Sequence, residues 1–149
     1  MIRRATQADM DSILTMGERF YRSSHYSGWA DFCRESSRTL VQMVIDTGVL
    51  MIAEQDGKDV GMVGLVVAPF MFNNSKLGAY EVFWWVEPEA RGGMTAWRLL
   101  KSIEPVCAEM GVTSIQMVVL SDSPEQAAKM YERAGYTHSE TSFTKILRD

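Results

Sequence analysis

A short stretch near the middle of the chain combines residue types that bind anions. Residues Val86 to Leu100 read VEPEARGGMTAWRLL, in which an arginine and two glycines separate an apolar run from an amphipathic one. A strand that enters a helix through such a turn presents free N–H groups, and the helix dipole favours negative charge there. Glycine also lets a phosphate approach the backbone where a Cβ would intrude. Neither G-x-x-x-x-G-K-[ST] nor G-x-G-x-x-G occurs, which excludes two common nucleotide-binding motifs.

Three side chains outside this turn have the chemistry to move protons. Tyr131 has helical spacing with its apolar neighbours, so an ordinary core tyrosine is the alternative to a catalytic one. Glu81 lies in the apolar run AYEVFWWV and is either a base or an acid that reaches solvent at a strand end. His25 lies in an aromatic-rich segment, where a surface histidine in a turn is the simpler interpretation.

Composition limits the classes of protein that fit. A chain of 149 residues, 46% hydrophobic and 23% charged, is typical of one globular domain spanning residues 1–149. The formal net charge of −4 argues against nucleic-acid binding and is compatible with cationic partners such as amines. The two cysteines, Cys33 and Cys107, match no metal or redox spacing, so we expect free thiols and no metal. Because no apolar run is long enough to span a membrane and no signal peptide is evident, we expect a cytoplasmic protein.

The elements that must position these residues follow from hydrophobic spacing and turn signals. Thr6 and Asp9 resemble a capping box before a helix over Asp9 to Tyr21, and Asp56-Gly57 predicts a hairpin turn. A second helix over 36–48 should bury Leu40 and three further apolar residues. The predicted strands are 2–6, the two arms of the hairpin over 49–69, 79–88, 114–120 and 139–147. The remaining elements are a loop over 70–78, a helix after the glycine turn in which Pro105 lies, and a helix beginning at Ser123, Pro124 and Gln126. The order β-α-α-β-β-β-α-β-α-β predicts an α/β protein, a mixed sheet with helices on both faces.

The glycine turn resembles the acetyl-CoA loop of the GNAT superfamily of N-acetyltransferases. That pattern is V-x-P-x-x-[QR]-G-x-G-x-[GA], and Val86, Pro88, Arg91, Gly92 and Ala96 stand in register with it. The resemblance extends over nearly the whole chain through IRRATQADM, AEQDGKDVGMVGL and AAKMYERAGYTHSETSFTKIL. The stretch FWWVEPEARGG is also similar to small acetyltransferases encoded by tailed phages. The resemblance implies the GNAT fold, with a central, mostly antiparallel sheet that splays at the cofactor site.

Acetyl-CoA is the cosubstrate that this resemblance implies, and the turn would wrap its pyrophosphate. Backbone groups of Trp84, Trp85 and Val86 would pair with the pantetheine amide and polarise the thioester carbonyl. Met94 departs from the family pattern, which usually has glycine there. If that position needed a positive φ, methionine would cost roughly 1–2 kcal/mol, but we expect Met94 to begin the helix with an ordinary φ. The implied pyrophosphate-binding residues are Arg91, Gly92, Gly93, Met94, Thr95 and Ala96.

The same resemblance assigns the two proton transfers that acetylation of an amine needs. A lysine-like amine with a pKa near 10.4 is only about one part in a few thousand neutral at pH 7, so a base must take its proton. Glu81 matches a glutamate that several relatives use through water. Tyr131 matches the family tyrosine that protonates the leaving thiolate. Pro124 stands where the family often has an asparagine that contacts the pantetheine arm.

The segment RFYRSSHYSGWADF maps onto the region that lines the acceptor site in this family. Asp31 or Glu35 would receive a cationic amine, and the stretch APFMFNNSK would form the opposite wall. The alternative is a loop whose aromatic side chains simply cover the sheet. The residues of the aromatic wall would be Tyr21, His25, Tyr26, Trp29 and Phe32.

These features together predict an N-acetyltransferase that moves an acetyl group from acetyl-CoA to a primary amine by direct attack in a ternary complex. The acceptor would be a protein lysine, a protein N-terminus or a small amine. The apolar run FWWV and the last strand would suit a homodimer. The alternatives are a catalytically silent acyl-CoA-binding or protein-interaction module and a structural, virion-associated domain without a cofactor.

Overall fold

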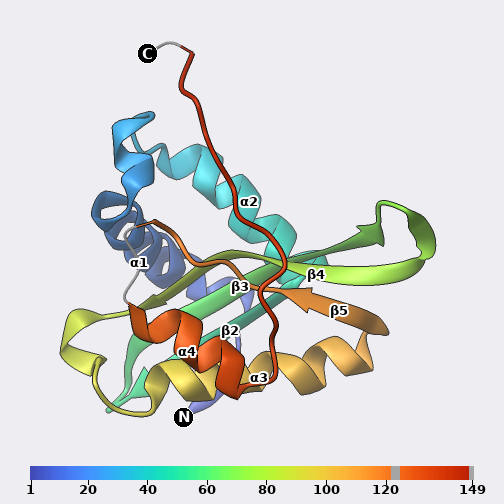
Figure 1. The fold of residues 1–149 in the computed structure, drawn as a ribbon. Coiled ribbons are helices and arrows are strands. Elements are labelled where there is room, and N and C mark those ends of the chain that lie inside the picture. The colour runs from blue at the N-terminus through green and yellow to red at the C-terminus, as the bar shows by residue number, and fades with distance from the viewer. Residues whose placement is uncertain (122–124, 148–149) are drawn as a thin grey trace.

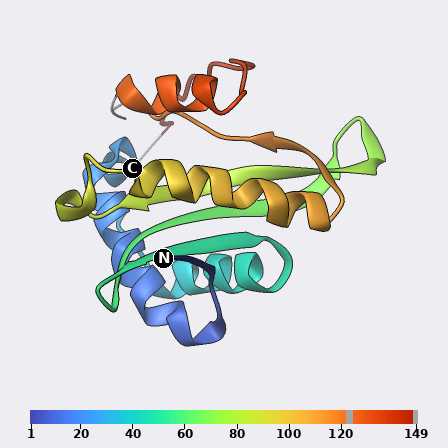
Figure 2. The ribbon, with the colours of Figure 1, turned by 90° about the horizontal axis from the view of Figure 1, so that it is seen from below.

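A mixed β-sheet forms the centre of the computed structural model, which describes residues 1–121 and 125–147. In this part of the chain the strands follow one another across the sheet as β1 (Ile2–Arg4), β2 (Val49–Gln55), β3 (Lys58–Phe70), β4 (Asn73–Val86) and β5 (Val112–Gln116). Neighbouring strands are antiparallel except β4 and β5, which are parallel. Helices α1 (Met10–Ser23) and α2 (Arg34–Thr47) cover one face, and α3 (Thr95–Glu109) and α4 (Glu125–Arg133) lie on the other (Figures 1 and 2). The α/β class, the mostly antiparallel sheet and the helices on both faces are therefore confirmed.

The sheet is buried on both faces, which explains the continuous apolar run of β2. Val49 and Met51 pack with α3 residues such as Leu99 in one core. Leu50 and Ile52 point to the opposite face and pack with α1 and α2 in a second core. Alternate side chains of a strand point to opposite faces, so a strand between two helical layers needs apolar residues at every position.

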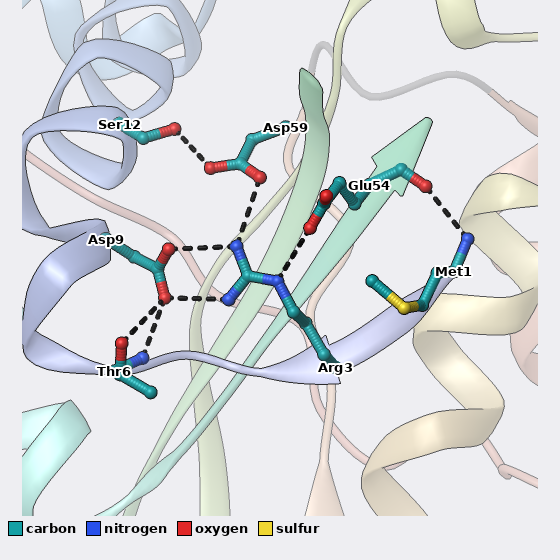
Figure 3. A network of polar contacts seen from close by, with 7 residues as sticks. All are labelled: Met1, Arg3, Thr6, Asp9, Ser12, Glu54 and Asp59. Carbon is teal, nitrogen blue, oxygen red and sulfur yellow. Dashed lines mark hydrogen bonds and ion pairs between the residues drawn. The ribbon is translucent and has the colours of Figure 1, made fainter. Parts of the chain in front are cut away.

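The predicted start of the first helix is confirmed, and the structure ties it to the sheet (Figure 3). The Asp9 carboxylate accepts hydrogen bonds from the Thr6 backbone N–H at 2.8 Å and from both terminal nitrogens of Arg3 at 2.8 and 2.9 Å. The same guanidinium donates to Glu54 and Asp59 of the hairpin over 49–69. The hydrogen bond from Arg3 holds the pKa of Asp9 below its ordinary value. The hairpin turn is also confirmed, since Asp56 and Gly57 both have positive φ, at 52° and 75°.

The expected loop over 70–78 is wrong, because β3 and β4 continue their pairing to Phe70 and Asn73. The polar residues of this stretch lie on an exposed hairpin arm, where ladder hydrogen bonds form without apolar side chains. Only Met71 and Phe72 make the turn, and their side chains are exposed. Pro105 lies inside α3 but does not end the helix, which runs to Glu109.

The C-terminal half of the predicted sheet differs from the structure. The strand expected over 114–120 ends at Gln116 and is not fully buried, because β5 has a neighbour on one side only. The strand expected over 139–147 does not form, and Phe143 is 93% exposed. Strand propensity forms no strand without a partner to pair with. The start of α4 predicted at Ser123 and Pro124 lies outside the described residues.

The second helix is also less buried than expected. Val41 and Val44 are buried as predicted, whereas Leu40 is 37% exposed and Ile45 is half-buried. Leu40 lies at the rim of a cleft between α1 and α2, where no further layer covers it. The helix therefore buries a narrower stripe than its spacing indicates.

Candidate active site

The sheet opens between β4 and β5. The two strands pair from Leu77 to Tyr80 on β4 and from Val112 to Gln116 on β5, and no pairing continues beyond this point in the described residues. The edge of β4 after Tyr80 is therefore open on the side of β5. On its other side β4 stays paired with β3 up to Val86, so the open edge is held rigidly.

A β-bulge interrupts β4 at this same place. Gly64 of β3 pairs with Phe83, whereas the next residue, Leu65, pairs with Glu81, so Val82 is the extra residue. A bulge bends its strand and re-aims the side chains beside it. Val82 and Phe83 consequently face α1 and α2 together, while Glu81 faces the opposite side.

Glu81 and Tyr131 meet across the opening, although 50 residues separate them in the chain. The Glu81 carboxylate accepts a hydrogen bond from the backbone N–H of Val118 at 3.2 Å. The Tyr131 hydroxyl donates to the Val118 carbonyl oxygen at 2.7 Å and lies 3.4 Å from the same Glu81 oxygen. Residue Val118 therefore binds both side chains through its backbone, just past the end of β5.

The surroundings of this pair raise the pKa of both groups, and the shift brings Glu81 close to neutral pH. Burial raises the pKa of Glu81 from 4.5 to about 7. Burial, reinforced by the Glu81 charge, raises the pKa of Tyr131 far above its ordinary value. A carboxyl group with a pKa near neutrality can accept and return protons at pH 7, and Tyr131 stays protonated as a donor.

The glycine turn leads from the open edge of β4 to the N-terminus of α3. Gly92 adopts a φ of +90°, which a residue with a Cβ rarely takes, whereas Gly93 has no such requirement. A Cβ at either glycine would meet no heavy atom within 4 Å, so the turn faces open space. Met94 has φ −97° and ψ 0° at the start of the helix, as expected, and its side chain is exposed. Its backbone therefore carries no penalty for lacking glycine.

The Arg91 side chain contacts β4. Its Nε donates to the Val86 carbonyl oxygen at 2.8 Å, and its guanidinium lies 4.6 Å from the ring centroid of Trp85. In this position the side chain braces the turn against β4. The positive end of α3 and the backbone N–H groups of 92–96 have the chemistry to bind an anion.

Buried polar atoms without a hydrogen-bond partner in the described residues occur on two rings that pack against Tyr131. Trp84 Nε1 and Tyr136 Oη are buried and have no hydrogen-bond partner among the described residues. Both rings pack on Tyr131, with centroid separations of 5.4 Å for Trp84 and 5.7 Å for Tyr136. Buried donors normally find partners, so these atoms fit a polar ligand that enters beside Tyr131. The residues of the opening and the turn therefore fit coenzyme A, whose arm carries amides and whose pyrophosphate is anionic.

On the other face of the sheet, α1, α2 and the segment between them enclose a cleft of about 390 Å³. Val82 and Phe83 of the bulge line it, so the cleft lies behind the open edge of β4. Tyr21 and Tyr26 of the predicted aromatic wall line it as well. Phe32 and Asp31 also line it, whereas Glu35 does not.

His25 and Trp29 do not line this cleft. Their rings pack against Tyr26, His25 tilted at a centroid separation of 4.4 Å and Trp29 edge-on at 4.9 Å. The stretch 68–76 predicted as the opposite wall also contributes no residue to the cleft. Trp85 lies on the face of α1, packed on Phe20 with a centroid separation of 6.3 Å.

Sequence analysis missed two residues of the site. Val118 acts through its backbone, which any residue would supply, and its position depends on where β5 diverges from β4. Tyr136 follows the Gly135 turn after α4, and the A-x-x-x-Y-x-x-x-G-[YF] pattern around Tyr131 would have drawn attention to it. In the described part of the chain, no helix is long and apolar enough to cross a membrane, and no cluster of metal-ligating residues occurs.

Comparisons with known proteins match this geometry. The family model described as Acetyltransferase (GNAT) family matches residues 14–136. Among solved structures, a probable acetyltransferase is 21% identical and superposes with a TM-score of 0.76, covering 100% of this chain and 99% of the other. A predicted acetyltransferase with acetyl-CoA from Clostridium acetobutylicum is 15% identical, with a TM-score of 0.75 and 97% and 94% of the two chains covered. AAC(6')-Iy, in complex with a bisubstrate analogue, CoA-S-monomethyl-acetylneamine, is 12% identical, with a TM-score of 0.76 and 100% and 98% covered. No curated protein matches the sequence.

Proposed function

The chain belongs to the acetyltransferase (GNAT) family and is an acyltransferase, and we propose that it transfers an acetyl group from acetyl-CoA to a primary amine. The observation that carries this proposal is the contact of Glu81 and Tyr131 through Val118 at the opening between β4 and β5. A base and an acid thus lie side by side where an acyl group and an amine can meet. The solved relatives with acetyl-CoA and with a CoA bisubstrate analogue support the same assignment.

In this proposal acetyl-CoA binds on the face of α3 and α4. Its pyrophosphate lies on the N–H groups of the glycine turn, residues 91–96, at the positive end of α3. Its pantetheine arm follows the open edge of β4, residues Trp84 to Val86, and its thioester reaches the bulge. Trp84 Nε1, buried without a protein partner, supplies a donor beside the arm.

The amine enters from the face of α1 and α2, and the chemistry needs two proton transfers. Glu81 accepts a proton from the ammonium group, directly or through a water molecule, and the amine nitrogen then attacks the thioester carbonyl carbon. As the C–S bond breaks, Tyr131 donates its proton to the thiolate sulfur. Glu81, 3.4 Å from the Tyr131 hydroxyl, returns to Tyr131 the proton that it accepted. The second proton of the amine nitrogen leaves to water as the tetrahedral intermediate collapses to the amide, so the site ends as it began. The attack is direct, and no acetyl group is carried by the enzyme.

Release of the CoA thiol in the presence of a primary amine tests this function. The wild-type protein should release thiol only when both acetyl-CoA and an amine are present. A Gly93→Asp variant places a carboxylate in the open space of the turn without straining φ, so it should weaken acetyl-CoA binding in a calorimetric titration. Gly28→Asp is the matched control, because a Cβ at Gly28 also meets open space. Tight acetyl-CoA binding without thiol release for any amine would instead establish a silent acyl-CoA-binding module.

We also propose a homodimer formed through the C-terminal segment 137–147. Phe143 and Leu147 are 93% and 85% exposed in the single chain, and Val118 and Val119 beside β5 are exposed as well. In Figure 1 this segment extends from the end of α4 toward the C-terminus without forming a helix or strand. Light scattering should give a dimer for the wild type and a monomer for Phe143→Glu. A monomeric wild type would refute the dimer.

The remaining proposals concern context. We propose that residues 1–149 act as a single catalytic domain and that the protein works in the cytoplasm without contacting nucleic acid or membrane. The similarity of FWWVEPEARGG to phage-encoded acetyltransferases supports a phage-like origin.

A further inference from the structure

The cleft between α1 and α2 has an apolar lining, which restricts the acceptors that can enter it. Its volume of about 390 Å³ falls in the range of small-molecule sites. The side chains that line it include Phe20, Phe32, Leu40, Val82 and Phe83. Leu40 is 37% exposed, although Val41 and Val44 of the same helix are buried, and its side chain lines this cleft.

The polar groups of the cleft are few, and most are already hydrogen-bonded within the protein. The Tyr21 hydroxyl donates toward the backbone carbonyl oxygens of Tyr26 and Ala30, so it offers little to a ligand. The Ser37 hydroxyl donates to the Cys33 carbonyl oxygen at 2.9 Å.

One negative charge completes the lining. Asp31 is the single charged side chain among the residues that line the cleft, and it forms no ion pair in the described part of the chain. Asp31 is exposed, so it lies at the mouth of the cleft and not in its apolar depth. One carboxylate can attract one ammonium group, whereas a polycation would leave its other charges against apolar walls.

The position of the cleft connects it to the reaction. Val82 and Phe83 form part of its lining, and they belong to the bulge that follows Glu81 directly in the chain. Because β4 and β5 do not pair beyond Tyr80 in the described residues, no strand pairing closes the sheet beside Glu81. An amine whose apolar part lies in the cleft would thus have a route for its nitrogen toward Glu81.

We infer that the acceptor is a small monoamine carrying an aromatic or branched aliphatic group, and not a polyamine or a lysine within a charged peptide. The apolar part packs between α1 and α2, Asp31 attracts the ammonium group on entry, and Glu81 receives its proton. This inference rests on the proposed function, since it names the substrate of the same site.

The test measures amine binding without acetyl-CoA, so that it does not depend on turnover. Saturation-transfer NMR should show 2-phenylethylamine binding to the wild-type protein and spermidine not binding. Leu40→Asn should weaken the binding of 2-phenylethylamine by about tenfold, because it places an amide in the apolar lining. Met43→Asn is the matched control, since Met43 is 43% exposed on the same helix but does not line the cleft, and it should leave binding unchanged.

Asp31→Asn should also weaken 2-phenylethylamine binding, by about tenfold. It should leave the unfolding temperature of the protein unchanged, because Asp31 is exposed. Spermidine binding as tightly as 2-phenylethylamine, or equal effects of Leu40→Asn and Met43→Asn, would overturn the inference. If 2-phenylethylamine binds as expected but no amine releases thiol from acetyl-CoA, the proposed function fails while the ligand class of the cleft is supported. If spermidine drives thiol release and 2-phenylethylamine neither binds nor reacts, the inference fails and the proposed function stands.

Discussion

Glu81 gives the sharpest prediction, because its carboxyl group should affect both the rate and the stability of the protein. The substitution Glu81→Gln keeps the shape of the side chain and keeps an oxygen that can accept the Val118 N–H. It removes the ionisable group. Catalysis should fall by roughly 10²- to 10⁴-fold, the usual contribution of a general base.

The effect on stability follows from the raised pKa. In the unfolded chain Glu81 loses its proton near pH 4.5, whereas in the folded protein it does so near pH 7. Between these values the unfolded state binds fewer protons, so the free energy of unfolding decreases as pH rises and levels off above about pH 7. The difference between the folded and unfolded pKa values of Glu81 lowers the free energy of unfolding by about 3 kcal/mol, since each pKa unit corresponds to about 1.4 kcal/mol.

Urea denaturation of both proteins at pH 5 and at pH 8 measures this difference directly. At each pH we take the free energy of unfolding of Glu81→Gln minus that of the wild type. This difference should be larger at pH 8 than at pH 5 by about 2–3 kcal/mol. Comparing the two proteins at each pH cancels the contributions of all other titrating groups. An equal difference at both pH values would show that Glu81 is not held with a raised pKa. In kinetics, kcat/KM of the wild type should rise with pH through about 7, and Glu81→Gln should lack this limb.

Further predictions concern the acid, the turn and the N-terminal network. Tyr131→Phe should lower kcat by about 10²-fold with an unchanged KM for acetyl-CoA; a wild-type rate in the thiol-release assay would remove Tyr131 from the mechanism. Gly92→Ala should lower the free energy of unfolding by about 1–2 kcal/mol because of the positive φ, whereas Gly93→Ala should leave stability within about 0.5 kcal/mol. Thermal unfolding of the two variants measures both effects. Equal losses of stability in Gly92→Ala and Gly93→Ala would contradict a turn in which only Gly92 has a positive φ. Asp9→Asn should cost about 2 kcal/mol at pH 7 through the weakened bonds to Arg3. That cost should shrink as pH falls from 3.8 toward the lowered pKa of Asp9 in the folded protein, because Asp9 then becomes protonated. Urea denaturation of the wild type and Asp9→Asn at pH 7 and at pH 3 measures this change.

Much of the fold could be predicted because its signals are local. The Asp56-Gly57 turn needs two positive φ values, and these residues adopt them more readily than most. The ordinary φ of Met94 followed from placing it at the start of a helix, and the structure confirms it. The capping box of Thr6 and Asp9 depends on residues only three apart, and the structure confirms it.

The remaining features depend on contacts between distant parts of the chain. The segment over 139–147 has the composition of a strand, but it pairs with no strand among the residues that the structure describes. Leu40 has the spacing of a core residue, and only the separation of α1 and α2 leaves it exposed in a cleft. The contact of Glu81 with Tyr131 through Val118 depends on where β5 diverges from β4, which no local pattern specifies.

The central claim is direct transfer of an acetyl group from acetyl-CoA to an amine across the opening between β4 and β5. Mass spectrometry of a reaction with acetyl-CoA deuterated in its acetyl group tests it most directly, by following the label in both the amine and the intact protein. The account predicts a deuterated amide formed in equal amount to the released CoA, with no acetyl group on the protein when the amine is omitted. Label accumulating on the protein, or CoA released without a labelled amide, would contradict it.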